Sequence, residues 1–114
     1  MRKLILATCL MLSSNAWSLD TAKLIEHCER NDGLGDGYCI GYYSGVLQAT
    51  ANTIATFKTG GLGVFDFYCA PENFTMGIGV KVWKRYVEEN PEMLTEDPFY
   101  TITFSLQDAY PCDN

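Results

Sequence analysis

Mostly apolar positions in the middle of the chain recur with the spacing of one long helix. Steps of three and four residues separate Ile40, Tyr43, Leu47, Thr50, Ile54 and Phe57. Such steps place side chains on one face of an α-helix, so this stretch is predicted to be the central core helix. Gly41 and Gly45 lie one turn apart in it, and each lowers helix propensity by about 1 kcal/mol. We therefore expect these glycines to mark a close crossing with another helix.

A second helix is predicted to follow Asn73 or Thr75, either of which is a suitable N-cap residue. Its broad apolar face consists of two neighbouring rows, Met76, Val80, Trp83 and Val87 beside Ile78, Val82 and Tyr86. Asn90 and Pro91 end the helix because proline cannot continue the hydrogen-bond ladder.

Two shorter segments flank these helices. Residues 21–30 have helical spacing after a possible cap at Asp20 or Thr21. Residues 98–110 fit a strand by alternation and a helix by three-to-four spacing. Asp97 followed by Pro98 is typical of a helix start, and Pro111 lies one helix length beyond. We therefore predict an all-α fold, a small four-helix domain.

The two connecting segments rich in glycine are the predicted loops. Residues 31–37 contain three glycines among turn-forming residues, which predicts a loop carrying Asp32 and Leu34. A calcium loop beginning at Asp32 would have a tyrosine where the bidentate glutamate is required, which argues against calcium. Residues 59–68 interleave glycines with apolar side chains. If exposed, these form a docking element; otherwise they fold back over the core. The candidate partner-binding residues are Leu62, Phe65, Asp66, Phe67, Asp32 and Leu34.

The first eighteen residues have the three parts of an export signal. Arg2 and Lys3 form a basic start, residues 4–12 an apolar run, and Ala16 and Ser18 the small residues of a cleavage site. Cleavage is predicted after Ser18, which leaves residues 19–114 as one exported domain. The apolar run is shorter than the roughly 20 residues that a membrane span needs, so no membrane association is expected after cleavage.

Four cysteines remain in the exported chain, and an even set in a small secreted domain predicts two disulfides. We favour pairing Cys28 with Cys112 and Cys39 with Cys69, with Cys28–Cys39 and Cys69–Cys112 as the close alternative. Zinc is disfavoured because none of the spacings is C-x-x-C and the compartment is oxidising. We predict no metal and no other cofactor.

Charge and side-chain chemistry narrow the function. Arg2 and Lys3 leave with the signal, so six basic residues remain against fourteen acidic ones and the net charge becomes −8 instead of −6. This disfavours nucleic acid and anionic membranes as partners and suits a basic protein surface. His27 is the only histidine, and no nucleophile–base pair, metal set or poised carboxylate pair is evident. We therefore predict a binding protein and no enzyme.

The cysteines stand within short motifs whose order resembles the Rap/Tai immunity proteins. After Cys28 at the end of the first helix, these motifs are CIGYYSGV at 39–46, YCAP at 68–71 with FT at 74–75, YV at 86–87 with NPE at 90–92, and AYPC at 109–112. The resemblance covers nearly all of the exported chain.

The resemblance implies a small helical protein of the Gram-negative periplasm that neutralises a peptidoglycan amidase effector delivered by type VI secretion. It implies a cognate amidase as partner, inhibition by occlusion of the amidase cleft, and possible pairing of two copies as a homodimer. The alternative function is that of a periplasmic acid-stress chaperone, since such chaperones are also small, helical and stapled by disulfides. Neutralisation of the many carboxylates in acid would favour that alternative.

Overall fold

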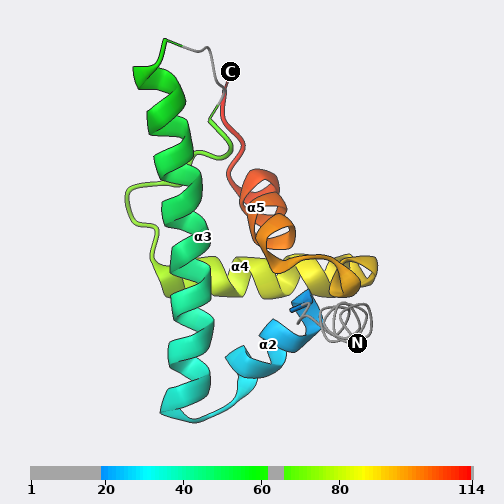
Figure 1. Cartoon of the computed structure of the whole chain (residues 1–114). Helices are drawn as coiled ribbons and strands as arrows, with labels where there is room; N and C mark the ends of the chain where they lie inside the picture. Colours follow the sequence, from blue (N-terminus) through cyan, green and yellow to red (C-terminus); the bar gives the residue numbers. More distant parts are fainter. Residues whose placement is uncertain (1–18, 62–65, 114) are drawn as a thin grey trace, which may run out of the picture.

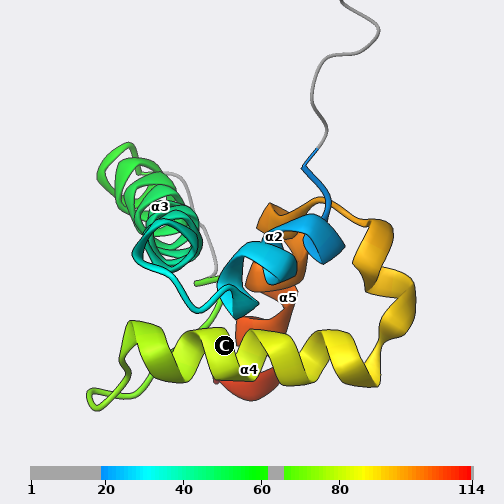
Figure 2. The ribbon, with the colours of Figure 1, turned by 90° about the horizontal axis from the view of Figure 1, so that it is seen from below.

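Four α-helices and one short 3-10 helix make up the fold in the computed structural model, which describes residues 19–61 and 66–113. They are α2 (Thr21–Glu29), α3 (Gly33–Thr59), α4 (Met76–Glu89), η1 (Pro91–Thr95) and α5 (Pro98–Ala109). The long helix α3 stands beside α5, while α4 runs crosswise to both (Figure 1). Seen along α3, the short α2 lies in front of α5, with α3 on one side and the η1 segment on the other (Figure 2). The predicted all-α class is confirmed.

Every α-helix begins at a side-chain cap. Asp20, Asp32, Thr75 and Asp97 each accept a hydrogen bond from a backbone N–H in the first turn. These contacts satisfy N–H groups that have no partner inside the helix. At α5 the cap is followed by Pro98 in the first turn, and residues 98–109 are helical. The helix prediction for this segment is confirmed, and the alternating strand pattern is misleading.

One apolar core joins the four helices. Its buried members are Leu24 of α2, Tyr43, Val46 and Leu47 of α3, Trp83 and Val87 of α4, and Ile102 and Leu106 of α5. The predicted face of α3 is buried only in its middle, at Tyr43, Leu47 and Thr50, while Ile40 and Phe57 near its ends are exposed. The helix therefore extends past the core at both ends.

A buried chain of hydrogen bonds links α4, α5 and α2 within this core. Trp83 Nε1 donates to Thr101 Oγ1 over 2.9 Å, and Thr101 Oγ1 lies 2.9 Å from Thr21 Oγ1. Thr21 Oγ1 donates in turn to the carbonyl of Glu96 over 2.7 Å. Because buried polar groups are costly without partners, this network favours one arrangement of the three helices.

Residues 33–37 are helical, so the predicted loop over residues 31–37 is wrong for most of its length. Asp32 caps α3, and only residues 30–32 connect it to α2. Gly35 is buried against the end of α2, where an added Cβ would lie 2.6 Å from Arg30 Cβ and 2.8 Å from the His27 carbonyl oxygen. The glycine thus permits a close approach between the two helices, and its presence does not break α3.

The disulfides join Cys28 to Cys39 and Cys69 to Cys112. The favoured pairing of Cys28 with Cys112 and Cys39 with Cys69 is therefore wrong, and the pairing in the structure is the one that we placed second. Because α3 begins at Gly33, Cys39 faces Cys28 across the α2–α3 turn with a Cα–Cα distance of 4.9 Å. The other bridge holds the segment before α4 against the chain that follows α5, where Cys69 N also donates to the Tyr110 carbonyl.

The close helix crossing occurs at a glycine other than those expected. Gly41 and Gly45 are exposed, and a Cβ added at either would meet no atom within 4 Å, so the predicted crossing there is wrong. Gly79 of α4 is buried instead, and a Cβ there would overlap the Tyr43 hydroxyl and lie 2.7 Å from Phe74 Cζ. Gly79 therefore lets α4 pack against the aromatic ring of Tyr43 on α3.

We expect Gly79→Ala to lower the free energy of unfolding by about 1–3 kcal/mol, the usual cost of overpacking a filled core. The matched control is Gly77→Ala in the same helix, where the added Cβ has only Thr75 Oγ1 nearby, at 3.9 Å. That control should unfold at the same denaturant concentration as wild type or slightly above it, because alanine favours the helix. Equal destabilisation by both substitutions would contradict the close approach at Gly79.

None of the helices among the described residues has the length and apolarity needed to cross a membrane. Residues 1–18, predicted to be an export signal, lie outside the described residues.

Candidate functional site

Of the two predicted contact residues near the start of α3, Asp32 is engaged within the chain and Leu34 is exposed to solvent. The Asp32 carboxylate accepts from the Gly35 N–H over 2.6 Å and pairs with the Arg30 guanidinium over 2.9 Å. The Gly35 N–H, and after it the Arg30 side chain, holds the pKa of Asp32 below its usual value. Leu34 is 75% exposed and contributes nothing to the core. Asp32 is thus a structural cap, and Leu34 is the side chain available to a partner.

The predicted contact residues beyond α3 are only partly within the described chain. Leu62 and Phe65 lie outside the described residues. The Asp66 carboxylate binds Lys58 Nζ of α3 over 2.7 Å, and Phe67 is exposed. The neighbouring Tyr68 turns inward, where its hydroxyl lies 3.1 Å from Thr50 Oγ1. Asp66 and Tyr68 therefore hold this segment against α3, while Phe67 between them is exposed.

The structure does not bring these two groups of residues together. Leu34 is in the first turn of α3 and Lys58, the partner of Asp66, is in its last. A rise of 1.5 Å per residue over the 24 intervening steps separates them by roughly 36 Å. The described members of the two groups thus belong to two separate candidate surfaces at opposite ends of α3, whose full length is seen in Figure 1.

A third surface, missed in the sequence, lies between α3 and α5. It is a groove of about 470 Å³ whose walls include Ala49 and Thr53 of α3, Phe67, and Phe99, Tyr100 and Phe104 of α5. We call it the aromatic groove. The signal was present in the sequence, because in a helix Tyr100 and Phe104 lie one turn apart, on the side opposite the buried Ile102 and Leu106.

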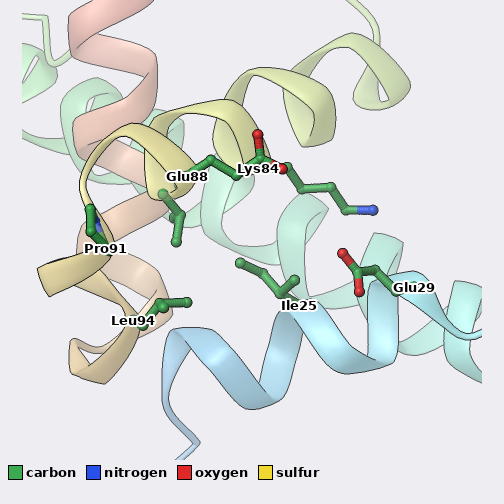
Figure 3. A pocket seen from close by; sticks show the side chains of 7 residues that line it. Ile25, Glu29, Lys84, Glu88, Pro91 and Leu94 are labelled. Carbon is green, nitrogen blue, oxygen red and sulfur yellow. The ribbon is translucent and has the colours of Figure 1, made fainter.

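A smaller hollow of about 160 Å³ lies between α2, α4 and η1. Ile25, Pro91 and Leu94 form its apolar part, while Glu29, Lys84 and Glu88 reach outward at its edge (Figure 3). The edge carries both signs of charge, and no ion pair joins these three side chains. This hollow therefore has no clear preference for one kind of partner.

Nothing in the described part of the chain resembles a metal centre, since no three His, Cys, Asp or Glu side chains gather there. His27 packs against the ring of Tyr38, with the ring centroids 4.5 Å apart. Burial raises the pKa of the Tyr43 hydroxyl, with smaller contributions from Tyr68 and Tyr110. That hydroxyl is enclosed in the core, where Tyr43 is fully buried. The notable surfaces of the molecule are thus apolar and aromatic.

The family model of the Rap1a immunity proteins matches residues 20–112. The chain belongs to the Rap1a immunity protein family. The match includes both disulfides and all four helices, so the family assignment describes the same domain as the fold. No curated protein and no solved structure matches the chain. As the sequence predicted, this Rap1a family member is a small helical protein with two disulfides. Its family implies immunity to a type VI effector.

Proposed function

We propose that this Rap1a family member is a periplasmic immunity protein that binds and occludes a peptidoglycan amidase effector delivered by type VI secretion. The observation that carries the proposal is the family match over residues 20–112, which spans nearly all of the domain beyond the predicted signal. The immunity role follows from the family, while the amidase and the periplasm come from the resemblance stated above.

The chemistry of the chain supports a periplasmic location. Two disulfides form and persist in an oxidising compartment, and the bacterial periplasm is one. The basic and apolar parts of residues 1–18 fit a signal that would deliver the chain there. An amidase that cuts peptidoglycan acts in that same compartment. Effector and immunity protein would therefore meet in the periplasm.

Inhibition would require contact and no chemistry of the immunity protein itself. The proposed contacts are Leu34 in the first turn of α3 and Phe67 beyond its last turn, together with Leu62 and Phe65, which lie outside the described residues. Exposed Leu34 and Phe67 are available as apolar anchors. Asp32 and Asp66 act through the local structure that they hold, since both carboxylates are engaged within the chain. An occluded cleft excludes peptidoglycan whatever the catalytic chemistry of the effector.

Pairing of two copies is a further part of the proposal that rests on the resemblance. Gly41 and Gly45 of α3 are exposed with no atom near a Cβ added at either, so this stretch of α3 offers room for a second copy. The exposed aromatic side chains of α5 fit the acid-stress chaperone as a second candidate function. That candidate requires general suppression of aggregation at low pH, whereas immunity requires one specific partner.

We expect the full-length chain to protect bacteria that export a type VI peptidoglycan amidase effector encoded beside this gene. Culture optical density after induction measures lysis. A version lacking residues 2–18 should leave cells as sensitive as an empty vector, because it stays apart from the periplasmic amidase. Full protection by the truncated version would contradict the proposed site of action. Lysis despite the full-length chain, combined with suppression of bulk aggregation in acid, would instead support the chaperone.

A further inference from the structure

Three aromatic side chains of α5 are exposed to solvent along the aromatic groove. Phe99, Tyr100 and Phe104 are 37%, 54% and 41% exposed although all three belong to one helix. Their rings pack on each other, Tyr100 with Phe104 in a stacked arrangement with centroids 6.2 Å apart, and Phe99 edge-on to Tyr100 at 5.8 Å. This mutual packing holds the rings in place with their outer faces open. The opposite wall of the groove consists of small side chains such as Ala49.

The exposed charged side chains at the two ends of α5 are acidic. Asp97 and Asp108 are exposed and lie at helical steps of three and four residues from Tyr100 and Phe104, so all four share one side of α5. The sequence contains no Lys, Arg or His after Arg85, but seven acidic residues. On α3 the only basic side chain is Lys58, and it is paired with Asp66. A partner with positive charge therefore meets no opposing cation at this groove.

We propose that the aromatic groove docks the effector, and that its occupant is a basic segment whose arginine or lysine stem lies along Tyr100 and Phe104 with its charge toward Asp97 and Asp108. This inference rests on the proposed function. Arginine and lysine combine an apolar stem with a cation that is attracted to aromatic ring faces. Exposed carboxylates on the same side of α5 attract the same cation from a distance and speed association.

A second copy of this chain fits the groove less well. A two-fold pairing through α5 would bring Asp97 and Asp108 of each copy near those of the other, and α5 contains no basic residue to separate them. The exported chain also has a net charge of −8, so two copies repel each other over distances set by the salt. The charge pattern thus favours a basic partner over self-association at this surface.

The test uses the full exported chain and the purified amidase effector encoded beside its gene, with affinity measured by calorimetry. Tyr100→Ala combined with Phe104→Ala should weaken binding by roughly 30-fold or more, the size of effect typical of aromatic anchors. Phe57→Ala is the matched control, because Phe57 is equally exposed but lies outside the groove. It should bind within about twofold of wild type. Thermal unfolding of each variant verifies that the fold is intact.

The charge part is tested with Asp97→Asn combined with Asp108→Asn. Asparagine at position 97 still accepts the hydrogen bond from the Phe99 N–H that caps α5, so the helix is retained. Association with the amidase should become slower at low salt and depend less on salt concentration than it does for wild type.

The outcomes separate the inference from the function on which it rests. Unchanged affinity of the double aromatic variant, or an unchanged salt dependence of the asparagine variant, overturns the docking surface and leaves immunity standing. A wild-type chain that sediments as a dimer, and becomes monomeric on loss of Tyr100 and Phe104, assigns the groove to a second copy and overturns the proposal. Failure of the wild-type chain to bind any such amidase overturns both the function and the inference.

Discussion

Replacing Cys69 and Cys112 together by serine is expected to lower the free energy of unfolding by about 4 kcal/mol. The bridge closes a loop with a sequence separation of 43 residues, and chain entropy makes the stabilisation grow with loop length. The same relation gives about 3 kcal/mol for Cys28–Cys39, whose separation is 11. Since small domains are stable by only about 5–15 kcal/mol, either loss is a large fraction of the total.

Urea denaturation of both double-serine variants, followed by far-ultraviolet circular dichroism, measures the two losses side by side. The short-loop variant is the matched control, because it also replaces two cysteines and leaves no free thiol. A larger loss from the Cys28–Cys39 pair would show that strain or native contacts outweigh loop entropy here. Peptide mapping under non-reducing conditions tests the pairing itself, and a fragment joining Cys28 to Cys112 would contradict it.

The pairing could not be predicted from the sequence because it depends on where α3 begins. Three glycines after Asp32 suggested a loop, and a loop would have left Cys39 free to reach Cys69. In the structure the Asp32 cap and the close approach at Gly35 start the helix early. That start brings Cys39 opposite Cys28. A capping residue thus outweighed the low helix propensity of glycine, because tertiary contacts stabilise the first turn.

The helices themselves could be predicted because their signals are local. The Asp97–Pro98 pair decided the last helix, and the three-to-four spacing identified α3 and α4. Glycine at a helix crossing was harder, since Gly41, Gly45 and Gly79 look alike in the sequence. Only Gly79 lies opposite a large side chain, Tyr43, that needs the space. Which glycine is structurally required depends on the partner helix, and no local pattern contains that information.

The exposure of the candidate contact residues could not be decided from the sequence, which left open whether the apolar side chains of residues 59–68 face solvent or the core. The structure shows that Leu34 and Phe67 are exposed. A single sequence does not show whether a neighbouring carboxylate such as that of Asp66 is paired within the chain. Asp66 was predicted to address a partner, but the structure places Lys58 beside it and so reduces the charge available to a partner. Conversely, the aromatic groove unites α3 with α5, which are separated by about 40 residues of chain and joined only by packing. Surfaces assembled in this way emerge only in three dimensions.

The second large effect is expected at Trp83, which is fully buried between the helices. Trp83→Ala should lower the free energy of unfolding by about 3–5 kcal/mol, because it removes a large apolar side chain and leaves a cavity. It also removes the indole N–H that donates a hydrogen bond to Thr101 Oγ1 in the network linking α4, α5 and α2. Urea denaturation followed by far-ultraviolet circular dichroism measures the loss, since Trp83 is the only tryptophan in residues 19–114 and its fluorescence disappears with it.

Two further variants separate packing from hydrogen bonding. Trp83→Phe keeps most of the apolar volume but loses the indole N–H, and should cost less than the alanine variant. Thr101→Val keeps the shape but leaves the buried indole N–H without its acceptor, at an expected cost of about 1–3 kcal/mol. Trp83→Phe and Thr101→Val break the same hydrogen bond. The variant that combines these two changes should therefore lose less stability than the sum of the two single losses. Simple additivity would show that Trp83 stabilises the fold through packing alone, and that the hydrogen bond to Thr101 contributes little.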